Sequence, residues 1–389
     1  METKVGGESM IVRLADNIVS PLGLTTSENY KAVKSGRSAL CRYDGLWDLP
    51  EPFVASLMER DQVEDAVSTM IGEKPYTFFE KMILLSVSQA LKDTDIDPTS
   101  ERVLFILSTT KGNVFLLDRR VTGFPQERVL LGQAARQLTD FFHNPNAPIV
   151  VSNACISGVC AQIEAMRNLE SGDYDYVVVV GADVQSAFIV SGFQSFKALS
   201  EEPCKPFDAD RRGLNLGDAA ATIIYTRKEK AGDNDWVACR GAIRNDANHI
   251  SGPSRTGEGS YRALKSVLGD LNPDQLAFIN THGTATLYND EMESVAIERA
   301  GLSNVPVNGL KGYYGHTMGA AGILETILSM WAVDDHTILA TRGFENLGVT
   351  HPLVLSSENR QTDKRAFIKL LSGFGGCNAA LLLAKGGIA

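Results

Sequence analysis

Long apolar runs and cysteine motifs are the features that this 389-residue sequence lacks. Its longest apolar stretches, at residues 176–182 and 379–384, are far shorter than the roughly 18 residues that span a bilayer, so we expect no membrane span. Residues 1–10 contain no apolar core and predict no signal peptide. The six cysteines form no C-x-x-C pair, which favours free thiols in a reducing compartment, and we expect a cytoplasmic protein.

Positive charge is also scarce, because 37 basic residues face 47 acidic ones and the net charge is −10. A general phosphate-binding surface is therefore not expected, which argues against a nucleic acid as partner. The sequence also lacks H-x-x-x-H and G-x-x-x-x-G-K-[ST], so it predicts no zinc or other metal site and no phosphate-binding loop. What is present, 44% apolar and 22% charged residues, is typical of a globular protein.

Apolar, β-branched runs alternate with helical patterns along the chain, which indicates a layered α/β fold. The predicted strands are residues 10–19, 103–108, 148–152, 176–181, 220–226, 236–241, 277–280, 305–308, 366–371 and 379–384. The predicted helices include residues 77–92, 159–170, 260–268, 290–300 and 320–333. A charged, glycine-containing stretch at residues 228–235 is the strongest break in composition. We therefore expect an N-terminal half, residues 1–230, and a C-terminal half, residues 235–389.

A small pattern occurs once in each half. After the strand at residues 148–152, Cys155 is followed by a glycine and a glutamate at offsets of three and nine residues. After the strand at residues 305–308, His316 is followed by the same residue types at the same offsets, ending at Glu325. We interpret the two segments as a duplicated strand–turn–helix unit. A pseudo-twofold axis between the halves would bring Cys155 and His316 together in one shared active site.

Cys155 is the first candidate for chemistry, because it lies at a predicted strand-to-helix junction. The unpaired N–H groups and the dipole of a helix N-terminus favour the thiolate, which is the nucleophilic form of cysteine. A buried structural cysteine is the alternative that the local sequence leaves open.

Two of the six histidines, His282 and His316, lie in glycine-rich loops shortly after predicted strands. Such loops carry the ligand-handling groups of α/β folds. A core histidine is the alternative for each alone, but a cysteine and two histidines at such junctions favour one site. We expect the other four histidines at the surface. Residues 371–380 form a glycine-rich turn around Phe374, whose backbone N–H groups either approach a substrate oxygen or simply close a tight hairpin.

Five motifs together resemble the β-ketoacyl-acyl-carrier-protein synthases of the elongating, Cys-His-His type, a branch of the thiolase-fold superfamily. The motifs are Asn153-Ala154-Cys155-x-x-Gly158, Lys205-Pro206-Phe207-Asp208-x-x-Arg211-x-Gly213-x-x-x-Gly217, Thr281-His282-Gly283-Thr284-x-Thr286 with Asn289-Asp290-x-x-Glu293, Lys311-x-x-x-Gly315-His316-x-x-Gly319-Ala320-Ala321-Gly322-x-x-Glu325, and Gly373-Phe374-Gly375-Gly376-x-Asn378-Ala379-Ala380. The resemblance covers essentially the whole chain. It implies a thiolase-like α/β fold, in which two duplicated halves form a layered α/β/α/β/α sandwich.

The resemblance also implies a role for each matching residue. Cys155 would be the nucleophile that accepts an acyl group from a carrier protein. His282 and His316, as neutral or donor imidazoles, would assist malonyl decarboxylation and stabilise the enolate oxygen. The backbone N–H groups of Cys155 and Phe374 would form the oxyanion hole, with Phe374 as the gate. The remaining implied site residues are the buried pair Lys311 and Glu325, the pantetheine contacts Thr284 and Thr286, and the substrate-binding Asn378.

The implied reaction is a decarboxylative Claisen condensation in fatty acid, aryl polyene or polyketide-type biosynthesis. Acyl-Cys155 and malonyl-carrier protein give a 3-oxoacyl-carrier protein, CO2 and the free thiol. No cofactor of the protein's own is expected, because the substrate acyl carrier protein brings the 4′-phosphopantetheine. The alternative is a non-catalytic ketosynthase homologue that sets chain length as the structural half of a heterodimer. Such partners typically lose the cysteine, so the presence of Cys155 favours the enzyme.

Two kinds of protein partner follow from the resemblance. The acidic carrier protein needs a local basic patch on this acidic chain, for which Lys205 is the first candidate and Arg119 and Arg120 are weaker ones. We also expect a homodimer, or a heterodimer with a ketosynthase homologue, with residues 114–117 in the contact. Arg212 stands where the family pattern has Asp, and this departure leaves the substrate range open.

Overall fold

All ten predicted strands belong to one mixed sheet in the computed structural model, which describes residues 9–72 and 74–387. These strands are β1 (Met10–Val19), β4 (Val103–Ser108), β5 (Ile149–Val151), β6 (Tyr176–Asp183), β8 (Ala219–Lys228), β9 (Trp236–Asn245), β10 (Leu276–Asn280), β11 (Val307–Asn308), β14 (Ala366–Gly373) and β15 (Cys377–Lys385). Their order across the sheet is β11-β10-β14-β15-β9-β1-β8-β6-β4-β5. The prediction of an α/β fold is confirmed.

The two halves of the sheet have the same strand pattern. In the first half β1, β8 and β6 are antiparallel neighbours, and β4 and β5 then continue parallel to β6. In the second half β9, β15 and β14 are antiparallel neighbours, and β10 and β11 continue parallel to β14. The halves meet where β1 pairs with β9, at Val12 opposite Val237. The predicted duplication is therefore visible as topology, with β5 and β11 in equivalent places.

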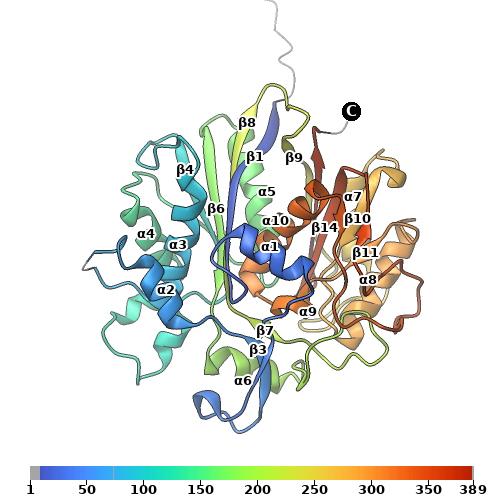
Figure 1. Ribbon diagram of the computed structural model, residues 1–389, viewed down its shortest axis with the longest axis horizontal. Helices are drawn as coiled ribbons and strands as arrows, with labels where there is room; N and C mark the ends of the chain where they lie inside the picture. Colours follow the sequence, from blue (N-terminus) through green and yellow to red (C-terminus); the bar gives the residue numbers. More distant parts are fainter. Residues whose placement is uncertain (1–8, 73, 388–389) are drawn as a thin grey trace, which may run out of the picture.

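Helices cover both outer faces of the sheet and fill the space between its halves (Figure 1). The central pair, α5 (Ser157–Glu170) and α10 (Ala321–Asp334), packs in one apolar cluster with strands of both halves. The outer layers are α3 (Phe78–Lys92) with α4 (Leu131–Phe141), and α7 (Glu258–Leu268) with α8 (Leu287–Arg299), each over its own apolar cluster. The expected α/β/α/β/α sandwich is confirmed.

The two central helices touch through glycines. A Cβ atom on Gly158 would lie 3.0 Å from the Cα of Gly322, and a Cβ atom on Gly322 would lie 2.6 Å from the backbone nitrogen of Val159. Only glycine permits so close an approach of two backbones. The crossing therefore places the segments before the two helices, which carry Cys155 and His316, beside each other.

Short elements that the sequence did not predict complete the structure. They are α1 (Thr26–Lys34), β2 (Cys41–Tyr43), β3 (Phe53–Ser56), α2 (Arg60–Val67), α6 (Ala187–Ser195), β7 (Leu216–Gly217), α9 (Lys311–Tyr314), β12 (Thr337–Ile338), β13 (Arg360–Gln361) and the 3-10 turns at Leu46–Asp48, Val114–Leu117, Gln126–Val129, Pro273–Gln275 and Met318–Ala320. Strands β2, β3 and β7 form a small separate sheet. Two or three residues are too few to show a period of alternation, so the sequence pattern had no signal there.

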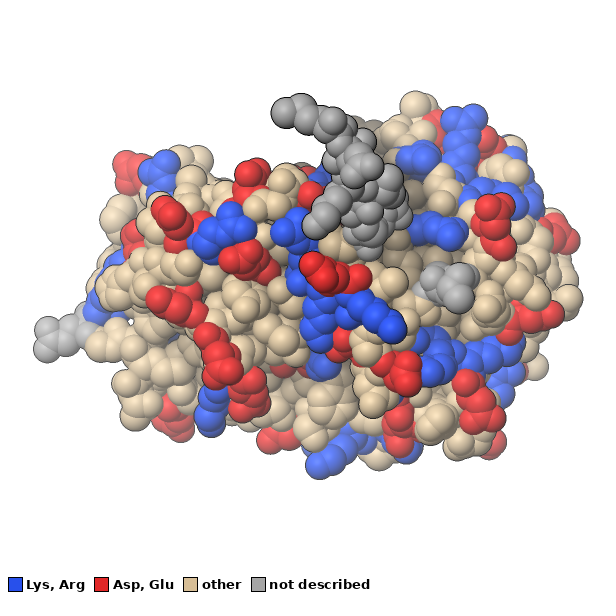
Figure 2. Space-filling view, turned by 90° about the horizontal axis from the view of Figure 1, so that it is seen from above, with Lys and Arg blue, Asp and Glu red and all other residues tan. Residues whose placement is uncertain are grey.

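The surface at the end of the molecule opposite α6 has Lys and Arg side chains interspersed with Asp and Glu (Figure 2). None of the helices within residues 9–72 and 74–387 combines the length and the apolar character that crossing a membrane requires. The segment from which no signal peptide was predicted, residues 1–10, lies outside the described residues except for its last two.

Candidate active site

Cys155 lies in the turn between β5 and α5. Ala154 has a φ angle of 45°, a left-handed conformation that is strained for a residue with a side chain. The turn is held by Ser157, whose hydroxyl accepts from the N–H of Asn153 at 2.7 Å and donates to the carbonyl of Ala154 at 2.6 Å. Cys155 itself is half-buried. The structure thus presents the thiol at a tightly fixed turn, two residues before the helix begins.

His282 follows β10, and its loop is anchored by one carboxylate. Glu293 of α8 accepts from the backbone N–H of His282 at 2.7 Å and from that of Gly283 at 2.8 Å. The side-chain amide of Asn289 donates to the same carboxylate at 2.9 Å. Burial and the neighbouring Asp290 raise the pKa of Glu293 to about 7. These motif residues therefore act on the imidazole by fixing its backbone.

His316 is positioned by the short strand β7. Its N–H donates to the carbonyl of Asn215 at 2.6 Å, and its carbonyl accepts from the N–H of Gly217 at 3.1 Å. A Cβ atom on Gly217 would overlap the carbonyl oxygen of Tyr314, so this strand can approach the histidine loop only with glycine at that position.

The structure brings these three side chains together: the duplicated unit predicted that Cys155 and His316 would meet, and the loops after predicted strands predicted that His282 would join them. The sulfur of Cys155 and one nitrogen each of His282 and His316 lie within 4.8 Å of one another. The two imidazole centroids are 5.1 Å apart, with their planes at 82°. Both nitrogens of His316 and Nδ1 of His282 are buried and have no hydrogen-bond partner within residues 9–72 and 74–387, so they can bond to a molecule that enters the site.

Cysteine and histidine are also ligand types of zinc, so the same three atoms could in principle hold a metal ion. Two buried ammonium groups nearby, those of Lys311 and Lys369, act electrostatically on both imidazoles and disfavour a further positive charge there. The electrostatics of the site therefore favour an anion over a cation.

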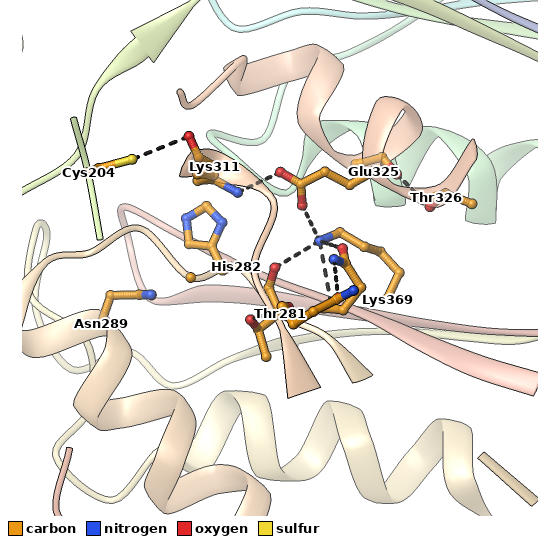
Figure 3. A network of polar contacts seen from close by, with 12 residues as sticks. Cys204, Thr281, His282, Asn289, Lys311, Glu325, Thr326 and Lys369 are labelled. Carbon is orange, nitrogen blue, oxygen red and sulfur yellow. Dashed lines mark hydrogen bonds and ion pairs between the residues drawn. The ribbon is translucent and has the colours of Figure 1, made fainter. Parts of the chain in front are cut away.

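A buried charge network of Lys311, Glu325 and Lys369 lies beside His282 (Figure 3). The expected pair is present, since Nζ of Lys311 lies 2.8 Å from Oε1 of Glu325. The other carboxylate oxygen of Glu325 pairs with Lys369, a residue that the sequence analysis missed. The available signal was one lysine within the otherwise apolar strand predicted at residues 366–371.

The electrostatic environment sets the protonation of the site. Burial, together with Lys311 and Lys369, lowers the pKa of both histidines well below 6.5, so both imidazoles are neutral at pH 7. Burial also raises the pKa of the Cys155 thiol to about 12. The expectation of a thiolate is therefore wrong for this state of the protein, because burial is the largest influence on the pKa of this thiol and favours its neutral form.

Glu325 has the opposite behaviour. Burial alone would raise the pKa of this carboxyl, but Lys311 and Lys369 together hold it below its usual range. The carboxylate is thus ionised and binds both ammonium groups at once.

A cavity of about 410 Å³ opens onto Cys155 and both histidines. Thr284 and Thr286 line it, and their hydroxyl groups lie 2.9 Å apart. Lys197 and Arg212 add positive charge to the lining. His249, which we expected at the surface, is exposed and also lines the cavity.

Phe374 lies at this cavity in the turn between β14 and β15. Its ring stacks on Phe193 of α6 at 6.1 Å and meets Phe196 edge-on at 5.5 Å. The sequence analysis missed this aromatic pair, although its spacing of three residues was visible. The turn itself is close to the nucleophile, since a Cβ atom on Gly373 would lie 3.1 Å from the backbone nitrogen of Cys155.

Some residues expected at the site lie outside the described lining of the cavity. Asn378 is buried and fixes the turn, accepting from the hydroxyls of Ser260 at 2.7 Å and Ser372 at 2.9 Å. Lys205 is half-buried and does not line the cavity. Arg120 is exposed and pairs with acidic neighbours of its own chain.

Two family models match the chain, "Beta-ketoacyl synthase, N-terminal domain" over residues 11–231 and "Beta-ketoacyl synthase, C-terminal domain" over residues 237–345. The chain is similar to the 3-oxoacyl-(acyl-carrier-protein) synthase 2 of Vibrio cholerae, with 28% identity over 95% of this chain and 97% of that protein. It is similar to the enzyme of the same name from Rhizobium meliloti, with 31% identity over 69% and 68%.

Among solved structures, the chain resembles the ketosynthase ApeO in complex with its chain length factor ApeC from Xenorhabdus doucetiae. The TM-score is 0.85 and the identity 24%, with 99% of each chain covered. This likeness confirms the predicted thiolase-like fold.

Proposed function

The chain belongs to the β-ketoacyl synthase family, and from this premise we propose that it condenses an acyl group on Cys155 with malonyl-acyl-carrier protein, releasing CO2. The observation that carries the proposal is the convergence of Cys155, His282 and His316 within 4.8 Å at the end of one cavity. A nucleophile beside two neutral imidazoles suits acyl transfer followed by enolate chemistry.

The first half-reaction loads the cysteine. The thiol is protonated at rest, so its proton passes to a neutral imidazole as the sulfur attacks the thioester carbonyl of the acyl carrier. The carbonyl oxygen gains charge and is met by the backbone N–H groups of Cys155 and Phe374. When the intermediate collapses, the carbon–sulfur bond to the carrier breaks, and the proton returns to the departing carrier thiol.

The second half-reaction extends the chain. The malonyl group loses CO2, and the electron pair of the broken carbon–carbon bond forms an enolate whose oxygen accepts hydrogen bonds from His282 and His316. The enolate carbon attacks the acyl carbonyl on Cys155, the bond to the sulfur breaks, and the resulting thiolate takes up one proton from solvent. Because one cysteine serves both steps, the first carrier leaves before the second enters, which gives ping-pong kinetics.

The acyl carrier protein is the partner that these steps require, and its pantetheine arm would enter past Thr284 and Thr286. We propose that Lys197 and Arg212, on the cavity lining, contribute to the basic patch together with the expected Lys205. The cytoplasm is the proposed compartment, because the sequence has neither a C-x-x-C pair nor the cysteine framework of a small disulfide-bonded domain.

A dimer is the proposed assembly, either of this chain with itself or with a ketosynthase homologue. Strand β5, which leads to Cys155, is an edge strand of the sheet and is paired on one side only. Leu117 and Leu130, on segments that precede β5, leave 49% and 61% of their surfaces exposed. An exposed edge and apolar side chains suit association of two subunits. A monomer with full activity at micromolar concentration in light scattering would contradict this.

Intact-protein mass spectrometry tests the function directly. The protein is exposed to a panel of acyl-carrier proteins, and we expect one acyl group to be added to Cys155 and then lost, as 3-oxoacyl-carrier protein, when malonyl carrier is supplied. The added mass also identifies the accepted acyl chain. Absence of acylation with every carrier tested would favour the non-catalytic alternative instead.

A further inference from the structure

Lys369 is the buried charged residue of the site to which no role has been given. It lies in the middle of β14 between Ile368 and Leu370, and its side chain has no exposed surface. A buried ammonium group is costly unless its hydrogen bonds and charge are matched. The contacts of the Lys369 ammonium group therefore indicate the role of this residue.

Four oxygen atoms surround the ammonium of Lys369 (Figure 3). One is a carboxylate oxygen of Glu325, and two belong to Asn280, whose side-chain oxygen lies 2.6 Å and whose carbonyl lies 3.5 Å away. The fourth is the carbonyl of Thr281, at 3.0 Å. Because Thr281 directly precedes His282, Lys369 holds the backbone that carries this imidazole.

The network also has more positive than negative charge. Lys311 and Lys369 both pair with the single carboxylate of Glu325, so this group of three has a net charge of +1. Glu293 also faces Lys369, and because its pKa is raised to about 7 it is only partly ionised at pH 7 and offsets only part of this charge, while the two histidines are neutral. A buried excess charge attracts an anion to the nearest accessible space, which is the cavity at the imidazoles.

The two half-reactions differ in the charge of the substrate group that enters the cavity. Loading Cys155 brings a neutral thioester and moves a proton within the site, so the total charge there stays the same. Extension brings a malonyl group with a negative carboxylate. This carboxylate leaves as CO2 and the remaining group becomes an enolate, so an anion is present throughout. The excess charge should therefore act mainly on extension.

We infer that Lys369 is a positioning residue of the extension step, which fixes His282 through Thr281 and supplies the charge that draws the malonyl carboxylate and the enolate to the imidazoles. The inference rests on the proposed function. It adds a second lysine to the pair Lys311–Glu325 and assigns it to one half-reaction.

Measuring the two half-reactions separately in the full-length protein tests this. Lys369→Met keeps an unbranched side chain that is one atom shorter and removes the charge. We expect malonyl-carrier decarboxylation, followed as CO2 release, to fall about 10- to 100-fold, the scale of one charge at an effective protein dielectric of about 20. Acylation of Cys155, followed by mass spectrometry, should change less than about threefold. Lys364→Met, an exposed lysine just before the same strand, is the matched control and should leave both rates unchanged.

Two further measurements separate charge from packing. Burial lowers the pKa of Lys369 to about 8, so wild-type decarboxylation should decline above pH 8 as the ammonium loses its proton, and Lys369→Met should lack this decline. Lys369→Gln, whose amide can still donate to Thr281 and Asn280, should show the same selective loss. It also serves as the test variant if Lys369→Met does not fold.

Equal losses in both half-reactions, or unchanged decarboxylation in a folded variant, would overturn the inference. An alkaline decline that persists in Lys369→Met would do so too, because another group would then be titrating. If the wild type acylates Cys155 but releases no CO2 from malonyl carrier, the proposed function fails first and the inference fails with it.

Discussion

The floor and the mouth of the cavity are held in opposite ways. The floor is formed by His282 and His316, with Lys311, Lys369 and Glu325 buried beneath them, and these five residues have exposed fractions of 0 to 4%. The mouth, consisting of Phe196, Leu287, Tyr288 and Phe374, has exposed fractions of 38 to 78%. Hydrogen bonds fix the backbones of the two histidines, and ion pairs fix Lys311, Lys369 and Glu325, whereas the four residues at the mouth remain exposed to solvent.

This contrast indicates that the floor serves the chemical steps and the mouth serves recognition. Preorganised donors and charges stabilise a transition state only when they cannot move or exchange with water, which is the condition in the floor. A surface that admits a carrier arm and releases it again requires adjustable contacts, which is the condition in the mouth. Changes in the floor should therefore affect the rate of the chemical steps, and changes in the mouth the KM for carrier-bound substrates.

The largest effect is expected from the nucleophile that faces the floor. Cys155→Gln should reduce condensation to background, because no thiol remains to carry the acyl group. Malonyl decarboxylation should continue at or above the rate of the unloaded wild type, since the glutamine amide imitates the acyl carbonyl in the oxyanion hole. Radiolabelled CO2 release measures this. A folded Cys155→Gln protein that releases no CO2 would show that the cysteine, and not the floor, drives decarboxylation.

The next largest effect tests the contribution of the floor in a protein that already lacks the Cys155 thiol. Adding His316→Ala to Cys155→Gln should lower CO2 release by about 100-fold, the scale of one lost electrostatic stabiliser. The same assay applies, and circular dichroism checks that both proteins are folded. Release that survives the loss of both His282 and His316 would contradict their assignment to the enolate.

A smaller effect tests how the floor is fixed. Gly217→Ala adds a Cβ atom against the carbonyl of Tyr314, so we expect a loss of about 1–3 kcal/mol in the free energy of unfolding and a roughly tenfold loss of condensation. Gly132→Ala is the matched control, because nothing lies within 4 Å of its added Cβ atom and alanine suits helix α4. Urea denaturation measures both. A Gly217→Ala protein as stable and active as the wild type would mean that the loop of His316 can shift.

Changes at the mouth should be weaker and selective. Lys205→Glu and Lys197→Glu should each raise the KM for carrier-bound substrate, by about fivefold at most, because an exposed charge contributes up to roughly 1 kcal/mol. Lys197→Glu should have the larger effect, since Lys197 lines the cavity and Lys205 does not. Steady-state kinetics with a small thioester mimic is the comparison, and the mimic should react normally. Equal losses with both substrates would remove these residues from the docking patch.

The smallest expected effect is that of pH on the decarboxylation rate. A free histidine would be half protonated near its usual pKa of 6.5, but burial and the two lysines lower the pKa of both histidines well below this value. Decarboxylation by Cys155→Gln should therefore change less than about twofold between pH 7.5 and pH 6.5. A half-maximal rate near pH 6.5 would mean that the floor is more hydrated than its burial implies.

The sequence predicted the strands and the reactive loops well, and for one reason. Residues 103–108 and 366–371 are buried on both faces, and continuous apolar runs of this kind report burial directly. Cys155 and His316 were found because each follows an apolar run that predicted a strand. Duplication then required that they meet, although nothing in the sequence gave the distance between them.

What escaped prediction depends on contacts between distant segments. Lys369 interrupts an apolar strand, and a sequence pattern has no means of telling a buried, paired lysine from an exposed one. Its partner Glu325 is 44 positions away along the chain. The thiolate expected at Cys155 failed similarly, because the helix dipole is visible in the sequence whereas burial by the surrounding chain is not.

The glycine crossing of α5 and α10 limits how the molecule can move. With a Cβ atom on Gly322 only 2.6 Å from a backbone nitrogen of the facing helix, the two helices have no space in which to slide or rotate. Opening and closing during turnover therefore fall to peripheral segments. The turn at Gly375 and Gly376 is itself tied to residues 246–250, because the N–H of Gly375 donates to the carbonyl of Ile250 at 2.7 Å and the carbonyl of Gly376 accepts from the N–H of Asp246 at 2.9 Å. Any movement of this turn would therefore have to carry residues 246–250 with it, while the helix crossing keeps Cys155 and His316 at a constant separation.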